Sequence, residues 1–249
     1  MIESLLPPEL GPLVATALLG VSFLGSFITA AFGIGGGVVV LAVFASLLSP
    51  AALIPVHGVI QLGSNAGRAL IMREHISWPV FIPFVIGALI GVAIGGIVVV
   101  DLPPHIIQIA VGLFILWTIV AKPPAFLRHS AWLAGGFSSF LTMFFGATGP
   151  FVAAYIKTLG VERLVHVGTQ AACMTMQHGL KVLAFGLLGF AFGPYIALIV
   201  GMIAFGFIGT LVGRKVLMKI DEKRFKTILN AILILLSLRL IWAGASTYL

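Results

Sequence analysis

The sequence predicts an all-α polytopic membrane protein made of two inverted repeats. Each repeat is a broken, re-entrant helical hairpin followed by three transmembrane helices. Three observations lead to this fold class: an apolar composition, an internal duplication, and a reversal of loop charge between the two copies. Hydrophobic residues make up 60% of the chain and charged residues 8%, at a mean hydropathy of +1.20. A soluble domain carries about a quarter charged residues, so the chain is expected to lie in a lipid bilayer.

The formal charge of +7 does not indicate nucleic-acid binding. Most basic residues stand in short loops between apolar runs, as the positive-inside rule expects. The single cysteine, Cys173, excludes an intramolecular disulfide. We therefore expect no nucleic-acid partner and no disulfide framework.

Apolar runs define the expected segments in chain order. A bilayer core of about 30 Å needs about 20 helical residues, and the runs near or above this length are 13–32, 51–72, 76–100, 165–189, 195–213 and 227–249. The first is read as a retained span, because no basic region or small-residue cleavage site precedes it. Two shorter runs are 106–121 and 131–146, and two half-length runs are 38–48 and 151–160. The sequence leaves open whether the half-length runs are re-entrant or complete a crossing.

The chain repeats itself. Residues 32–47 align with 145–160 at a spacing of 113, and 81–96 align with 195–210 at a spacing of 114. We predict a single integral-membrane domain with these parts: an N-terminal tail 1–12, repeat 1 at 13–121, a cytoplasmic linker 122–130 and repeat 2 at 131–249.

Loop charges predict how the copies are related. The loop 101–105 has one acid and no Lys or Arg, whereas its counterpart 214–226 is strongly basic. The positive-inside rule then puts these equivalent loops on opposite sides. We therefore expect the copies to be inverted, with both termini outside. The alternative, four crossings per copy in parallel orientation, would leave one of the two loops with the wrong charge.

Each copy carries a row of polar residues on one helical face. In copy one the row is His57, Gln61, Ser64, Asn65 and Arg68, and adding 113 gives Gln170, Met174, Gln177, His178 and Lys181. A cation ends both rows. A charge at the centre of a membrane helix costs at least about 2.5–3.5 kcal/mol, so a compensating role is expected. The other interpretations are that Arg68 snorkels to the interface and that the histidines are packed polar groups.

Metal and carboxylate chemistry find little support in the sequence. His178, Cys173, Met174 and Met176 do not share one face, so we expect no metal and no cofactor. All seven acids stand in termini or loops, although cation carriers normally need carboxylates within the membrane. The buried charge is positive, so the expected substrate is an anion.

The glycines at 33–37 explain the half-length runs. A helix that begins after them aims free N–H groups and its positive dipole end into the membrane, which favours an anion. In copy two, Pro150 suits the first helical position and Thr148 adds a hydroxyl near the cap. The alternative is close helix packing, which better explains the small residues at 87–96.

The motifs "FGIGGGVVV" and "GATGPFVAAYIKTLGVERLVHVGTQA", in this order and spacing, resemble the sulfite exporter TauE/SafE family of permeases from Leu13 to Gly244. The resemblance implies transport of sulfite, thiosulfate or organosulfonates across a bacterial inner membrane. The chain departs from the family pattern at Thr148, where glycine is common, and at 56–60, where copy one often has Gly-Thr-Ser. These departures leave the particular substrate open.

We therefore predict a secondary transporter of a small sulfur-containing oxyanion, working by alternating access in a bacterial or archaeal inner membrane. The anion is expected between the hairpin tips. Its predicted binding residues are Gly33, Gly35, Gly36, Gly37, His57, Gln61, Asn65, Arg68, Gly146, Thr148, Gly149, Pro150, Gln170, Gln177, His178 and Lys181. The alternatives are a passive anion channel using the same site and, more remotely, an intramembrane enzyme. The sequence leaves open a proton or other coupling ion, the transport direction and a homo-oligomeric state.

Overall fold

The computed structural model describes residues 10–32, 35–99, 103–120, 124–128, 130–216 and 222–246. These residues form α-helices joined by short turns and 3-10 segments, and no strand occurs among them. The helices of the first half are α1 (Pro12–Phe32), α2 (Gly36–Leu47), α3 (Pro50–Ile71), α4 (Trp78–Val99) and α5 (Pro104–Val120). Those of the second half are α6 (Ala131–Phe145), α7 (Gly149–Thr158), α8 (Arg163–Leu187), α9 (Ile196–Val216) and α10 (Glu222–Ala245).

The predicted helical segments are confirmed. Each apolar run of the sequence forms a helix over most of its described residues, and the two half-length runs are α2 with 12 residues and α7 with 10. In the described part of the chain, three segments can cross a membrane by length and composition: Pro12–Ala31, Trp78–Val99 and Gly193–Gly213. The long helices α3 and α8 carry the polar rows, which lowers their hydropathy.

The chain divides into two compact units that do not follow the two sequence copies. Unit 1 comprises residues 1–57, 102–121 and 191–249, and unit 2 comprises 58–101 and 122–190. Each unit therefore takes helices from both halves of the sequence, and the division falls inside α3. The inverted relation of the copies stays a prediction.

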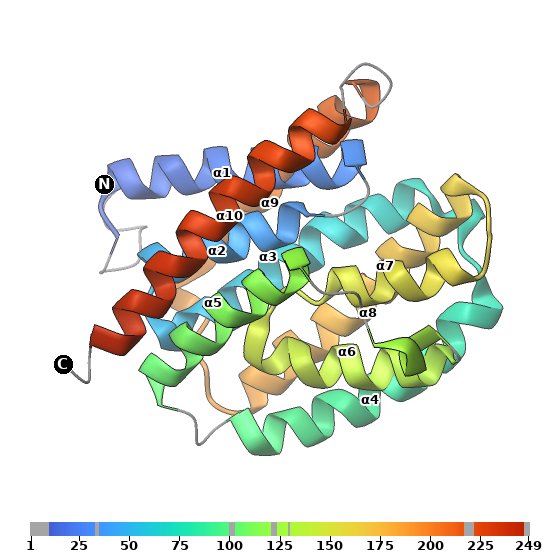
Figure 1. Ribbon diagram of the computed structural model, residues 1–249, viewed down its shortest axis with the longest axis horizontal. Helices are drawn as coiled ribbons and strands as arrows, with labels where there is room; N and C mark the ends of the chain where they lie inside the picture. The colour runs from blue at the N-terminus through green and yellow to red at the C-terminus, as the bar shows by residue number, and fades with distance from the viewer. Residues whose placement is uncertain are drawn as a thin grey trace. The chain divides into compact units, whose positions relative to one another are not determined.

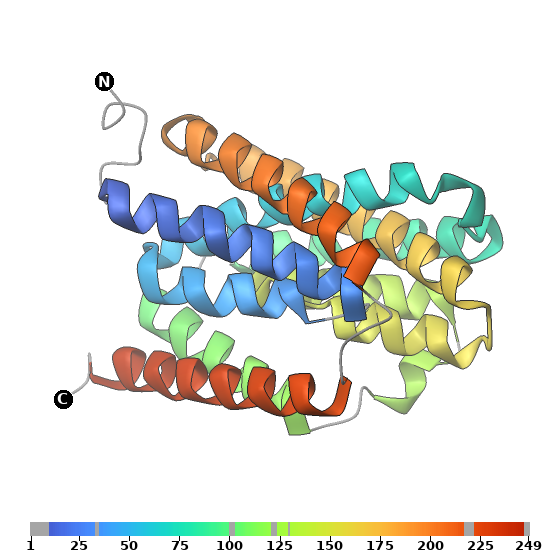
Figure 2. The ribbon, with the colours of Figure 1, turned by 90° about the horizontal axis from the view of Figure 1, so that it is seen from above.

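Unit 1 is held together by close contacts between helices that are far apart in the sequence. α9 packs against α1 and α10 against α5 (Figure 2). A Cβ at Gly209 would collide with the carbonyl oxygen of Phe23, and the Ser22 hydroxyl donates a 2.6 Å hydrogen bond to the Met202 carbonyl. Small residues and interhelical hydrogen bonds of this kind are typical of helix contacts in lipid.

Unit 2 has its closest contact between α4 and α6 (Figure 1). A Cβ at Gly87 would collide with the Trp132 carbonyl oxygen, and one at Gly91 with the Gly136 carbonyl oxygen. The packing interpretation of 87–96 is thus confirmed at these two glycines. A buried cluster that includes Phe84, Val152 and Cys173 joins α4 and α6 to α7 and α8.

A pair of glycines in α4 tests this contact. Gly91 has no room for a methyl group, whereas a Cβ at Gly96 would meet nothing within 4 Å. Overpacking typically costs about 1–3 kcal/mol, while Gly→Ala in a helix interior gains about 0.5–1 kcal/mol. We expect Gly91→Ala to lower the thermal unfolding midpoint of the purified protein and Gly96→Ala to leave it unchanged or raise it. Equal midpoints in the two variants would contradict the close contact of α4 with α6.

Candidate functional site

The chain between α6 and α7 is unwound over Gly146, Ala147 and Thr148. Gly146 has a φ of 78°, which L residues rarely adopt, so glycine ends α6 here. The Gly146 N–H donates to the Thr142 carbonyl at 3.1 Å, and the Thr142 hydroxyl donates to the Gly146 carbonyl at 3.0 Å. α7 begins at Gly149, so Pro150 is the second residue of its first turn, one place after the first helical position that the sequence predicts.

The polar row of α8 runs along this break. The Lys181 ammonium donates to the Gly146 carbonyl at 3.4 Å, and Gln177 Nε2 donates to Thr148 Oγ1 at 2.6 Å. A Cβ at Gly149 would lie 3.8 Å from the Met174 methyl group. Successive turns of α8 therefore meet successive residues of the break. The half-length helix α7 begins beside the row, as expected from the glycines.

Thr148 does not cap α7 through its side chain. It is the N-cap residue, so its hydroxyl lies near the cap as predicted, but it forms no side-chain cap hydrogen bond. Its hydroxyl oxygen instead accepts the hydrogen bond from Gln177, whose own Oε1 accepts from the Ser138 hydroxyl at 3.0 Å. A fully buried amide on the neighbouring helix competes successfully for the hydroxyl.

Lys181 is a fully buried cation. Its exposed fraction is 0%, and its stem packs on α3, where a Cβ at Gly58 would lie 2.7 Å from Cε and 3.5 Å from Nζ. Among the described residues no carboxylate pairs with it; its hydrogen-bond partner is a neutral carbonyl. Desolvation of an ammonium is expensive unless it is paired, and no negative charge among the described residues compensates this one.

Arg68 is the second buried cation, with 7% of its surface exposed. Its Nη1 donates to Asn65 Oδ1 at 3.2 Å, and Asn65 Nδ2 donates to the Gln61 carbonyl at 2.8 Å. Arg68 Nε is buried without a hydrogen-bond partner. Such burial does not agree with a side chain that snorkels to the interface.

In unit 2, the C-terminal part of α3 runs antiparallel to α8. Gly58 faces Lys181, Gly179 faces Leu62, and Gly168 lies against the carbonyl oxygens after α3, at Met72 and His75. Gln61, Asn65 and Arg68 follow Gly58 at helical spacing and so share its face. Asn65 lies about 10 Å along α3 from Gly58. The Lys181 ammonium and the Arg68 guanidinium thus flank a short polar track.

The predicted residues of unit 1 form a separate group. His57 is buried and its Nε2 is 3.0 Å from the Gly37 carbonyl, which joins α3 to the first turn of α2. Gly35 has a φ of 106°. A Cβ at Gly36 would collide with the Gly25 carbonyl of α1, so this glycine is needed for packing. Gly33 lies outside the described residues.

Two predicted residues of α8 lie outside the hydrogen bonds of the break. Gln170 is buried about two turns from Gln177, and its side chain hydrogen-bonds to His166. His178 is buried next to Gln177. Ser138 and Thr142 are not among the residues predicted from the sequence, although both are polar residues one turn apart in an apolar segment, the same signal that identified the rows on α3 and α8.

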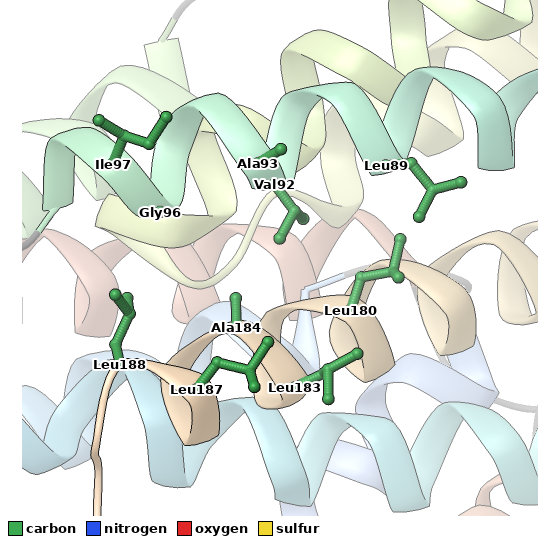
Figure 3. A pocket seen from close by; sticks show the side chains of 10 residues that line it. All are labelled: Leu89, Val92, Ala93, Gly96, Ile97, Leu180, Leu183, Ala184, Leu187 and Leu188. Carbon is green, nitrogen blue, oxygen red and sulfur yellow. The ribbon is translucent and has the colours of Figure 1, made fainter.

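A pocket of about 370 Å³ lies between α4 and α8 in unit 2 (Figure 3). Val92 of α4 and Leu180 of α8 point toward one another across it. Its lining is aliphatic or glycine: Leu89, Val92, Ala93, Gly96, Ile97, Leu180, Leu183, Ala184, Leu187 and Leu188. No charge and no side-chain hydrogen-bond donor is among these residues, so the pocket does not suit an oxyanion.

A buried lysine beside a broken helix and a second buried cation on the neighbouring helix, within a strongly apolar helical chain, are typical of a membrane protein of the transporter class. The family model for the sulfite exporter TauE/SafE matches residues 18–240, nearly the full chain, and the chain belongs to this family. Membership supports a multi-pass integral membrane transporter of sulfur-containing anions rather than an enzyme. Comparison with curated proteins and with solved structures returns no match.

Gly36 and Gly149, the first residues of the half-length helices α2 and α7, are expected to respond differently to an added methyl group. Gly149→Ala has room for its Cβ, whereas Gly36→Ala would push α2 away from α1. We expect Gly149→Ala to give a folded, monodisperse protein and Gly36→Ala to lower the thermal midpoint or the yield. Size-exclusion profiles and melting curves in detergent measure both effects. A stable Gly36→Ala protein would show that this glycine is not required for packing.

Proposed function

We propose that this protein is a secondary transporter that moves a small sulfur-containing oxyanion, of the sulfite or organosulfonate class, by alternating access. The observation that supports the proposal most strongly is the pair of buried cations, Lys181 and Arg68, with no carboxylate partner among the described residues. The anion binds along the track between them.

The donors that surround this track suit an oxyanion. Lys181 has three N–H donors and Arg68 five, and each uses one in the hydrogen bonds seen here. The N–H of Gly149, in the first turn of α7, has no partner within its helix, and the dipole of α7 adds positive potential at that end. An anion with several oxygens accepts hydrogen bonds from the unused N–H donors and neutralises the buried charge.

The positions of the acidic residues also favour an anionic substrate. Among the described residues, Glu74 is in a 3-10 turn, Glu162 precedes α8 and Glu222 begins α10. None lies in the interior of a helix, where a proton relay commonly places its carboxylates. If transport is coupled to protons, a histidine or the substrate itself carries the proton.

Alternating access is the proposed mechanism. Inverted repeats and broken helices at the substrate site are common in secondary transporters. Because each compact unit draws helices from both sequence copies, we propose the compact units, rather than the copies, as the bodies that move. The protein is expected in the inner membrane of a bacterial or archaeal cell.

Charge removal at Lys181 tests the site. A hydrogen bond to a charged group contributes about 1.5–3 kcal/mol, so Lys181→Gln and Arg68→Gln are each expected to reduce uptake of labelled sulfite into proteoliposomes at least tenfold. Lys157→Gln, at an exposed lysine of α7, is the matched control and is expected to transport like the wild type.

The same assay separates the candidate mechanisms. Saturable flux that depends on a counter-ion supports the transporter, whereas ohmic current would indicate a passive channel. Wild-type flux in both Lys181→Gln and Arg68→Gln would remove the proposed site.

Orientation is tested with a reporter fused after Leu249. The inverted-repeat prediction places both termini outside, because the basic loop 214–226 is expected in the cytoplasm. A periplasm-active reporter should therefore be active and a cytoplasm-active one silent. A fusion within 122–130 should give the opposite pattern, and a cytoplasmic C-terminus would contradict the inverted arrangement.

A further inference from the structure

Three fully buried side chains form a hydrogen-bonded chain across unit 2. Ser138 is on α6, Gln177 is on α8 and Thr148 is in the break, and each has an exposed fraction of 0%. Ser138 Oγ donates to Gln177 Oε1 at 3.0 Å, and Gln177 Nε2 donates to Thr148 Oγ1 at 2.6 Å. The chain ends at the residue just before α7.

Ser138 fixes the orientation of the Gln177 amide. The Ser138 hydroxyl has one proton, and its other acceptor, the Gly135 carbonyl, is 3.5 Å away, beyond the 2.5–3.0 Å range of O–H···O hydrogen bonds. The proton therefore goes to Gln177 Oε1, which turns Nε2 toward Thr148. Both ends of the amide are then engaged by the protein, and one of the two N–H donors of Nε2 is left over from these bonds.

This orientation leaves the Thr148 proton available. The Thr148 oxygen accepts from Gln177, so its own O–H is not used in that bond, and the hydrogen bonds of the described residues include no acceptor for this proton. If the Gln177 amide were turned over, Oε1 would take the Thr148 proton. A buried hydroxyl proton without an acceptor is costly, and an oxyanion beside Gly149 supplies one.

We propose that Thr148 is a specificity-determining donor to the transported oxyanion and that Ser138 and Gln177 are positioning residues that keep its proton directed to the substrate. This inference rests on the proposed function. It adds a neutral donor to the cation Lys181, which lies one turn further along α8 from Gln177 and contacts the same break.

The experiment measures the concentration dependence of labelled sulfite uptake in proteoliposomes. Thr148→Val, which removes the hydroxyl at similar volume, is expected to raise the apparent KM at least tenfold with little change in maximal flux. Thr148→Ser, which keeps the hydroxyl, is expected to restore the KM to within about threefold of the wild type.

Ser138→Ala is compared with Ser139→Ala. Ser139 is the next residue and equally buried, but its hydroxyl has no hydrogen-bond partner. We expect Ser138→Ala to raise the KM several-fold and Ser139→Ala to leave it unchanged. In the Thr148→Val background Ser138→Ala should add nothing, because its effect passes through Thr148.

The outcomes are distinguishable. An unchanged KM in Thr148→Val overturns the inference, as do equal effects of Ser138→Ala and Ser139→Ala or a fully additive double variant. If in these cases Lys181→Gln still impairs uptake, the proposed function stands. Absence of saturable sulfite uptake by the wild-type protein would overturn the proposed function itself.

Discussion

The contact between the Lys181 ammonium and the Gly146 carbonyl is the interaction on which the site depends. A charge removed from water must find polar groups inside the protein, and a continuous helix offers few because its carbonyls are already bonded. The unwound residues after α6 free the Gly146 carbonyl for Lys181 and for the Thr142 hydroxyl. A broken helix and a buried cation therefore stabilise one another. The positive charge left over is what suits the proposed site to an anion.

Glycines lie in three different physical environments in this chain. Gly146 supplies a backbone conformation with positive φ, Gly91 lets two helix backbones touch, and Gly149 lies beside the Met174 methyl group of the polar row with room for a Cβ. The glycine-rich break after α1 combines two of them, because Gly35 has positive φ and Gly36 packs on α1. The glycines of a broken membrane helix are thus not interchangeable, even where the two breaks align in sequence.

Hydrogen bonds among neutral side chains complete the organisation of unit 2. Ser138, Gln177 and Thr148 connect α6, α8 and the break within an interior that otherwise consists of aliphatic and aromatic groups. In a medium of low dielectric such bonds strengthen, and an unpaired member is costly. The network therefore fixes where each proton points, which a set of apolar contacts could not do.

The sequence by itself determined the helices, the two half-length segments, the rows that end in Arg68 and Lys181, and the anionic character of the substrate. These follow from local patterns: apolar run length, helical periodicity, glycine position and the near absence of membrane acids. Tertiary structure decided that Thr148 bonds to Gln177 instead of capping α7, that Ser138 joins the row, and that Gly36 packs on α1. It also decided that α1 packs with α9 and α4 with α6. The physical reason is that these contacts join residues remote in the chain, and the competition among polar partners is settled only when the helices pack.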